Sequence, residues 1–312
     1  MADGGPIVLG SALDRERWKQ LRRSGIGASE IAAVLGESPW LSAIELYAVK
    51  IGQSDGDPSL DTAEHVYWGN QLEAAIIAGY QDRTGRPVKR SAVLLRSAEH
   101  PWAICTLDGE TGDVGGEPSW PLEIKNVGMH KAVEWEDGPP PHYRLQLQHQ
   151  MLVTGAHKAT AAALIGGQRL VWCDVERDEI EIRRIKHAGR IFWEQCVEAG
   201  VCPKPDGSDS ASRALAALYS KRPDPESFVQ LGGDLLDLDE ELCGLKEAQR
   251  TLKQRIDLIE QHIKAAIGEA EYGALPNGTR YSWKQQTRAA YAVDEATFRV
   301  LRRHASKQEK SR

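Results

Sequence analysis

The spacing of hydrophobic positions changes along the chain, and each spacing predicts a different kind of element. Helical spacing occurs in four segments near the N-terminus: 14–23, a short stretch from Ala28, Ser42 to Gly52, and Asp61 to Gly85. Ser42 and Glu45 have the spacing of a capping box, as do Asp61 and Glu64. We therefore expect a helical N-terminal part that ends with one long helix.

Strand patterns follow this helical part. Runs rich in apolar residues predict strands at 87–95, 102–108, 122–127, 158–165 and 169–182. Helical spacing returns at 142–154 and 187–199. Because helices flank the block of strands on both sides, we predict an α/β (α+β) core with a central mixed sheet.

The composition changes beyond this core domain, which we place at 1–205. Residues 206–233 are rich in Pro, Gly, Ser and Asp, which is typical of a linker. In the next segment, 234–270, apolar residues recur by threes and fours, with Gln249 as the polar member: Leu235, Leu238, Leu242, Leu245, Leu252, Ile256, Ile259 and Ile263. This heptad pattern predicts a helix that packs on its own domain or self-associates as a coiled coil. Residues 271–312 contain an Asn-Gly turn, typical of a hairpin, and a basic tail.

The bulk composition excludes several classes of protein. A chain of 312 residues, 41% hydrophobic, can bury one sizeable core and carry a smaller extension. Its net charge of −6 gives no global basic signature, so nucleic-acid binding would need a local groove. The five cysteines lack the spacing of a zinc site or a disulfide framework. Because no signal peptide and no run of about 18 apolar residues is present, we expect a cytoplasmic protein without membrane association.

The segment "PLEIKNV", residues 121–127, is the first candidate for chemistry. Glu123 and Lys125 lie on one face of the predicted strand while apolar residues face the other way, an alternation that also describes ordinary surface strands. Asp108 ends the preceding predicted strand, fifteen residues before Glu123. Pairing of these two strands would bring the two carboxylates together.

A third carboxylate, Glu73, lies among apolar residues of the long helix and needs a partner there. Carboxylates about 4 Å apart repel by about 4 kcal/mol per pair at an effective dielectric of about 20. Three of them can therefore converge only if they are protonated, paired with Lys125 or bridged by a cation. Oxygen ligands suit Mg²⁺ or Mn²⁺, and we expect two ions. Such a site could hydrolyse a phosphodiester, with Lys125 orienting the water or stabilising the transition state.

Several motifs resemble those of a known family and occur in the same order. They are "WKQLRRSGIGASEIAAVLG", "WGNQLE", "CTLDGE", "LEIKNV" and "YRLQLQHQMLVTG". "LD" at Leu107 and Asp108, followed by "EIK" at 123–125, resembles the PD-(D/E)XK signature, with Leu107 in place of the usual proline. The whole set resembles phage-lambda-type exonucleases and YqaJ-like viral recombinases over about residues 15–200. The resemblance implies a restriction-endonuclease-like PD-(D/E)XK core.

The resemblance also implies a set of site residues. Glu73, Asp108, Glu123 and Lys125 match the catalytic residues of the family, and the three carboxylates match its metal site, with Glu73 acting directly or through a water. The backbone carbonyl of Ile124 would be a further metal ligand.

The following helix supplies more candidates. Tyr143 and Gln146, one turn apart on one face, match a family pattern in which the glutamine is catalytic and the tyrosine contacts DNA. An exposed polar helix face is the alternative. Gln148, His149 and Gln150 are weaker candidates, and a lone helix histidine is more often structural.

A phosphate site is implied near the N-terminus. Arg22 and Ser29 match the arginine and serine that hold the 5′-phosphate of a DNA end in the family. A guanidinium and a hydroxyl beside a helix start are suited to this task. Arg23 is an alternative, and so is a solvated basic helix face.

The family implies a DNA exonuclease of phage or prophage recombination in a bacterial host. Such an enzyme would degrade the 5′-ended strand of linear double-stranded DNA in the presence of Mg²⁺ and leave 3′ single-stranded tails. Its expected partners are DNA ends and a single-strand annealing protein, and a homo-oligomer is another expectation. The alternatives are a catalytically silent DNA-binding adaptor and a structure-specific endonuclease.

Overall fold

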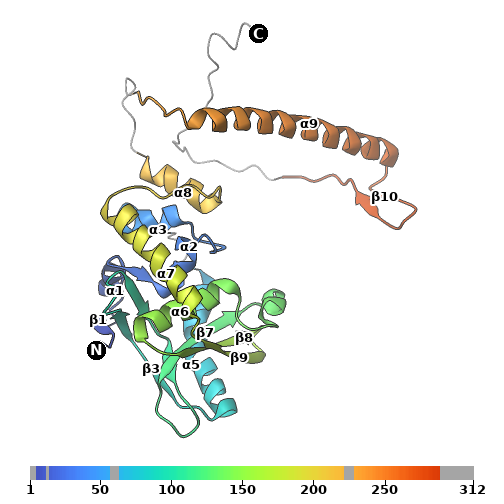
Figure 1. The fold of residues 1–312 in the computed structure, drawn as a ribbon. Coiled ribbons are helices and arrows are strands. Elements are labelled where there is room, and N and C mark those ends of the chain that lie inside the picture. The colour runs from blue at the N-terminus through green and yellow to red at the C-terminus, as the bar shows by residue number, and fades with distance from the viewer. Residues whose placement is uncertain (1–4, 12–13, 57–62, 221–227, 289–312) are drawn as a thin grey trace. The chain divides into compact units, whose positions relative to one another are not determined.

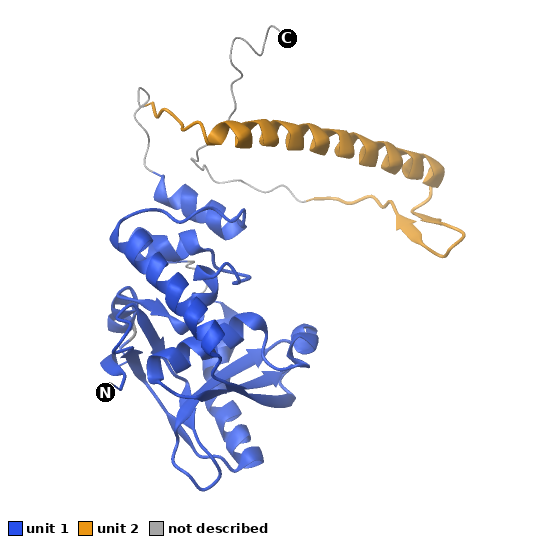
Figure 2. Ribbon diagram, in the orientation of Figure 1, with its two compact units in different colours: residues 1–220, 299–312 blue, residues 221–298 orange. Residues whose placement is uncertain are grey.

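The computed structural model describes residues 5–11, 14–56, 63–220 and 228–288. They form two compact units, the first holding the described residues up to Ser220 and the second those from Phe228 onward (Figure 2). None of the helices in these described ranges is long and apolar enough to cross a membrane.

The first unit contains two mixed sheets and the helices that cover them (Figure 1). Its strands are β1 (Ile7–Ser11), β2 (Ile26–Gly27), β3 (Val88–Arg90), β4 (Val93–Arg96), β5 (Ala103–Thr106), β6 (Gly109–Thr111), β7 (Trp120–Val127), β8 (Lys158–Ile165) and β9 (Arg169–Glu176). Its helices are α1 (Arg15–Arg22), η1 (Ala28–Glu30), α2 (Ile31–Val34), α3 (Ala43–Lys50), α5 (Glu64–Thr84), η2 (Met129–Trp135), α6 (Pro141–Thr154), α7 (Glu179–Ile191), η3 (Phe192–Glu198) and α8 (Asp209–Leu218).

The larger sheet has the order β3-β6-β7-β8-β9. Only β7 and β8 run parallel in it, and α6 is the crossover helix between them. Helix α5 packs on one face of this sheet and α6 on the other. The predicted mixed sheet with helices on both sides is therefore confirmed.

Hydrophobic burial fixes which way the side chains of β7 point. Leu122 and Ile124 are buried in the cluster that contains Ile77 and Tyr80 of α5. Burying each such side chain contributes about 1.5–3 kcal/mol, so a slip by one residue would cost this energy and expose the apolar face. Glu123 and Lys125 must therefore point to the face that α6 covers.

The smaller sheet has the order β1-β4-β5-β2, with a parallel pair between β2 and β5. Its core includes Trp102 and Cys105 and also takes in Leu152 of α6 and Ile185 of α7. Helix α6 therefore lies between the two sheets and packs against both β5 and β7. This central place makes α6 the helix that connects the parts of the candidate site.

Most helices begin and end where the sequence predicts. Asp14 caps α1 and Ser42 caps α3 through the backbone N–H of Glu45. Gly85 ends α5 and Gly155 ends α6, both with positive φ that glycine adopts without strain. Asp61, the other expected cap, lies outside the described residues.

Four element predictions are wrong in detail. The helix expected at 187–199 begins at Glu179 as α7 and continues as η3 to Glu198. The segment 87–95 forms two strands, β3 and β4, which belong to different sheets. The strand expected at 169–182 ends at Glu176, because Asp178 accepts hydrogen bonds from the N–H groups of Ile180 and Glu181 and starts α7. Part of the predicted linker forms α8, whose Ser210 donates a hydrogen bond to Glu45 of α3.

The second unit consists of one long helix and a hairpin. Helix α9 (Leu235–Ile267) contains 33 residues, and β10 (Tyr272–Ala274) pairs antiparallel with β11 (Arg280–Ser282). The turn of this hairpin contains Asn277 and Gly278, and Gly278 has a φ of 87°. The heptad helix and the Asn-Gly hairpin are thus both present.

Candidate active site

Asp108 lies beside β7 because of a strand that the sequence analysis missed. The expected pairing of the strand before Asp108 with the strand of Glu123 does not occur, since β5 and β7 belong to different sheets. Instead the chain turns at Asp108 into the short strand β6, in which Gly109 is the partner of Leu122. Asp108 Oδ2 then accepts a hydrogen bond of 2.8 Å from the backbone N–H of Ile124.

Glu123 and Lys125 form an ion pair on the face of β7 that α6 covers. Lys125 Nζ donates to Glu123 Oε1 at 2.5 Å. The ammonium group also lies 4.8 Å from the centre of the Tyr143 ring, in cation–π geometry. The second carboxylate oxygen of Glu123 accepts a hydrogen bond of 2.6 Å from Gln150 Nε2. Glu123 is only 4% exposed, so these contacts replace its hydration.

The pKa values of Asp108 and Lys125 both differ from the ordinary values of these groups. Burial and the neighbouring charge of Glu123 raise the pKa of Asp108 to about 8, against the opposing effect of Lys125. Burial disfavours the charge of Lys125, but Glu123 and Asp108 outweigh it and raise the pKa of the ammonium group. Lys125 is therefore a fixed cation, whereas burial and the charge of Glu123 favour the neutral form of Asp108.

Glu73 is placed differently from the expectation. It comes from α5 and is close enough to contribute to the raised pKa of Asp108. Its carboxylate, however, is bound to Arg90 of β3 at 2.5 Å. Nowhere in the described ranges do three His, Cys, Asp or Glu side chains come close enough together to bind a metal ion. The structure therefore brings Asp108, Glu123 and Lys125 together, with Glu73 at the edge of the group.

The sequence analysis missed Arg90 and ranked Gln150 too low. Arg90 could have been found only from the pairing of β3 with β6, in which Arg90 is the partner of Gly109. Gln150 did give a signal, because it follows Gln146 by four residues and so lies on the same face of the helix. Gln146 itself is buried, and no hydrogen bond joins its side chain to the other described site residues.

The other candidates on α6 have structural roles. Gln148 Nε2 donates to the carbonyl of Glu176, and Gln148 Oε1 accepts from the N–H of Asp178, which ties α6 to the turn before α7. His149 is fully buried with its ring 6.1 Å from that of Trp102. Burial lowers the pKa of His149 to about 4, so it is neutral at pH 7.

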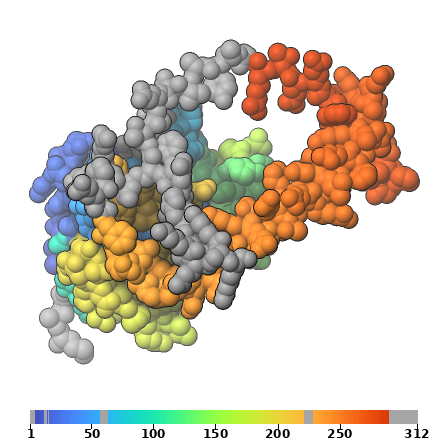
Figure 3. Space-filling view, turned by 90° about the horizontal axis from the view of Figure 1, so that it is seen from above, coloured from blue at the N-terminus to red at the C-terminus, as the bar shows by residue number. Residues whose placement is uncertain are grey.

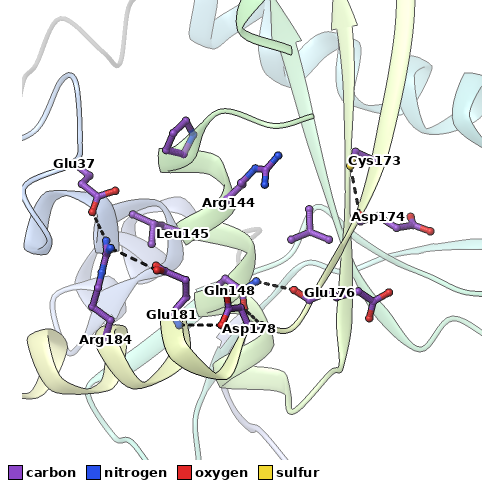
Figure 4. A pocket seen from close by; sticks show the side chains of 12 residues that line it. Glu37, Arg144, Leu145, Gln148, Cys173, Asp174, Glu176, Asp178, Glu181 and Arg184 are labelled. Atoms are coloured by element: carbon purple, nitrogen blue, oxygen red, sulfur yellow. Dashed lines mark hydrogen bonds and ion pairs between the residues drawn. The ribbon is translucent and has the colours of Figure 1, made fainter. Parts of the chain in front are cut away.

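A cavity of about 480 Å³ lies on the Gln148 side of α6 and not at the acidic group. Figure 4 shows Gln148 between Glu176 and Asp178, and Arg184 between Glu37 and Glu181. Glu37 and Glu181 pair with Arg184, and Asp174 pairs with Arg86. Asp178 caps α7. This cavity contains neither Asp108 nor Glu123, so we do not assign the chemistry to it.

Arg22 and Ser29 come together as the sequence predicts. Arg22 donates a hydrogen bond of 3.3 Å to Ser29 Oγ and forms a 2.6 Å ion pair with Glu30. Lys50 Nζ binds the other oxygen of Glu30 at 2.7 Å. Burial opposes the charge of Glu30, but Arg22 and Lys50 outweigh it and lower its pKa to about 2. The alternative, Arg23, pairs instead with the exposed Asp55 at 2.5 Å.

Comparison with known proteins shows the family to which this chain belongs. The family model of the YqaJ-like viral recombinase domain matches residues 17–157. The uncharacterized protein YqaJ of Bacillus subtilis (strain 168) is 32% identical over 274 residues, which are 87% of this chain and 84% of YqaJ. The chain belongs to the YqaJ-like viral recombinase family.

All the candidate site residues, from Arg22 to Gln150, lie within the range that the family model matches. Solved structures agree on the fold. The alkaline exonuclease LHK-Exo from Laribacter hongkongensis aligns with a TM-score of 0.50 at 22% identity, covering 65% of this chain and 99% of LHK-Exo. LHK-Exo in complex with dAMP also aligns with a TM-score of 0.50, at 23% identity, over 60% of this chain and 94% of that chain. The first unit thus shares the fold of LHK-Exo, and its mixed sheet covered by helices agrees with the predicted core.

Proposed function

We propose that this YqaJ-like recombinase is a metal-dependent DNA exonuclease that degrades the 5′-ended strand of linear duplexes and leaves 3′ single-stranded tails. The observation that supports this most is that Asp108, just before β6, meets the Glu123–Lys125 pair of β7. LHK-Exo, which shares the fold, is an alkaline exonuclease. The fold alone does not define an activity, so the proposal depends on the residues.

Different residues of this chain would have different roles in the hydrolysis of a phosphodiester. Lys125 stays protonated beside Glu123 and Asp108, so it can stabilise the negative charge that develops on the phosphate but cannot act as a base. Gln150 holds one oxygen of Glu123 and Lys125 the other, which fixes the orientation of this carboxylate. The N–H of Ile124 fixes Asp108 in the same way.

We propose Mg²⁺ as the cofactor, in two sites, with Mn²⁺ able to replace it. The donors present fit this choice, because one or two carboxylates with a backbone carbonyl and waters are a common set for Mg²⁺. Asp108, Glu123 and the carbonyl of Ile124 would hold the ions, with Glu73 contributing directly or through a water. Burial and the charge of Glu123 raise the pKa of Asp108, and a bound cation would favour its charged form. When bound, the ion would lower the pKa of a water and neutralise developing charge.

The Arg22 cluster is our candidate for the DNA end. A quarter of the Arg22 side chain remains exposed beside Ser29, so a phosphate could reach both groups. Such a guanidinium-hydroxyl pair can bind a 5′-phosphate through charge-assisted hydrogen bonds. A 5′-phosphate held by Arg22 would be in line with the proposed 5′ to 3′ polarity.

The biological role we propose is recombination of phage or prophage DNA in the bacterial cytoplasm. The 3′ tails would be passed to a single-strand annealing protein. A direct test of the activity incubates the purified protein with linear duplexes labelled at either end and with closed circular DNA. We expect loss of the 5′ label in Mg²⁺, none in EDTA and an intact circle. Cleavage of the circle would favour an endonuclease, and DNA binding without cleavage would favour an adaptor.

A further inference from the structure

The hairpin of the second unit combines basic and aromatic side chains. Residues 271–288 contain three basic residues against one acidic residue, so their net charge is +2 in a chain whose net charge is −6. The basic residues are Arg280, Lys284 and Arg288. Three of these 18 residues are aromatic, compared with 6% of the whole chain: Tyr272, Tyr281 and Trp283. The space-filling view shows the hairpin, in orange-red, at the surface beside one end of α9 (Figure 3). Such a segment is typical of a surface that binds nucleic acid.

The strand pairing brings one aromatic ring and two cations to the same face of the hairpin. Tyr272 of β10 is the partner of Ser282 of β11, and Ala274 is the partner of Arg280. Because paired residues point to the same face and side chains alternate along a strand, Arg280, Ser282 and Lys284 share the face of Tyr272. The ammonium group of Lys284 lies 4.6 Å from the centre of the Tyr272 ring, which agrees with this placement. We call these four side chains the open face.

The opposite face of the hairpin is turned toward α9. A Cβ atom added to Gly273 would lie 2.9 Å from the side chain of Ile267, near the end of α9. Tyr281 is the partner of Gly273, and Trp283 follows it on the same face. These two rings are 39% and 49% exposed, whereas Tyr272 on the open face is 56% exposed. Arg280, Ser282 and Lys284 are exposed as well. The hairpin is therefore held on α9 by one face and presents the other to solvent.

We propose that the open face binds single-stranded DNA without sequence preference, with a base stacked on Tyr272 and phosphates bound by Arg280 and Lys284. Charge complementarity supports this occupant, because phosphates attract the two cations and every base has a π-face that can stack on a ring. Four residues of a strand separate Arg280 from Lys284 by about 14 Å, and Ser282, the partner of Tyr272, lies halfway. The two cations thus flank the ring. The choice of DNA rests on the proposed function, since the exonuclease would leave 3′ single-stranded tails.

The contact between Lys284 and Tyr272 does not prevent stacking of a base. At an exposed site a cation–π contact is weaker than the stacking of a base on an aromatic side chain. A base should therefore replace the ammonium group on the ring of Tyr272, and Lys284 can then turn to a neighbouring phosphate. In a duplex the bases are already stacked on each other, so Tyr272 has access to them only in a single strand.

Fluorescence anisotropy on the full-length protein tests the role of the ring. The probe is a labelled oligothymidylate in EDTA, so that no metal-dependent cleavage takes place. Tyr272→Ala should raise the Kd by about fivefold or more, and Tyr272→Phe should bind like the wild type because it keeps the ring. Phe228→Ala is the matched control, since Phe228 is 84% exposed in the same unit but lies outside the hairpin. An unchanged Kd for Tyr272→Ala, or an equal loss in Tyr272→Phe, would overturn the proposal.

The salt dependence of the same binding tests the role of the cations. Each phosphate neutralised on a single strand contributes about 0.7 to the slope of log Kd against log salt concentration. The double variant Arg280→Ala with Lys284→Ala should therefore lower this slope by about 1.4. Lys246→Ala with Arg250→Ala removes the same charge from exposed positions of α9 and should change the slope much less. Equal slopes for the two double variants would contradict binding at the open face.

Two further results separate this inference from its alternatives and from the nuclease activity. Wild-type binding of oligouridylate more than tenfold tighter than of oligothymidylate would indicate RNA as the ligand and overturn the proposal. Cleavage of a linear duplex in Mg²⁺ is measured on the same proteins. Absence of cleavage with binding that depends on Tyr272 would contradict the proposed function alone, and cleavage without such binding would contradict this inference alone.

Discussion

The N–H of Ile124 donates a 2.8 Å hydrogen bond to Asp108, and this bond joins the two halves of the PD-(D/E)XK motif. Ile124 stands between Glu123 and Lys125, so the bond sets the distance of Asp108 from both charged side chains. It exists because Gly109 of β6 pairs with Leu122 of β7. The motif is therefore positioned by backbone pairing, with the side chains following from the alternation of the strand.

Gln150 should prove to be a positioning residue for Glu123. Gln150→Ala removes the 2.6 Å hydrogen bond to a buried carboxylate, which is worth about 1.5–3 kcal/mol. We expect kcat to fall by about tenfold or more while the KM for linear DNA changes little. Gln148→Ala is the matched control, since it loses bonds to Glu176 and Asp178 and should lower stability without lowering kcat. Equal kcat values for the two variants would argue against the role of Gln150.

Arg22 should allow the protein to distinguish 5′-phosphorylated from 5′-hydroxyl ends of DNA. Loss of charge-assisted hydrogen bonds to a phosphate should raise the KM of Arg22→Ala on 5′-phosphorylated duplexes by about tenfold or more, and much less on 5′-hydroxyl duplexes. The ratio of the two substrates cancels any loss of stability from the broken pair with Glu30. Arg23→Ala, which breaks only an exposed pair with Asp55, should leave this ratio unchanged. An equal loss on both kinds of end would remove Arg22 from end recognition.

Glu30 should make the folded state sensitive to acid. Its folded pKa of about 2 lies below its ordinary value, so its stabilising effect is present above about pH 4.5 and is lost as the pH falls toward 2. The effect is about 3 kcal/mol in the free energy of unfolding. In denaturant titrations, the difference between wild type and Glu30→Gln should therefore shrink from pH 6 to pH 3. The exposed pair of Glu194 with Arg190 provides a control, and Glu194→Gln should differ little from the wild type in stability. A constant difference for Glu30→Gln would contradict the buried ion cluster.

The sequence predicted much of this site because its signals are local. The face of Glu123 and Lys125 follows from the alternation with Leu122 and Ile124, and the ends of α6 follow from its pattern and Gly155. The route of Asp108 to β7 was not predictable, because β6 has three residues in a Gly-rich acidic segment and forms only through its partners. The strand expected to reach 182 has alternating Glu and Ile residues, and Asp178 converts them into a helix start.

Glu73 shows a second limit of sequence reasoning. The motif predicts its presence near the site, and its influence on the pKa of Asp108 agrees with that. The ion pair with Arg90 depends on β3 lying beside β6 in the sheet, a long-range feature without a local pattern.

The most direct test of the central claim compares Lys125→Ala with the wild type on a 5′-labelled linear duplex in Mg²⁺, with DNA binding measured in EDTA. Lys125 is the fixed cation of the site, and its loss should lower cleavage by about 100-fold or more while binding is largely kept. Lys204→Ala, at an exposed position in the loop before α8, should cleave like the wild type. Cleavage by Lys125→Ala at the wild-type rate would contradict the assignment of Asp108, Glu123 and Lys125 as the active site.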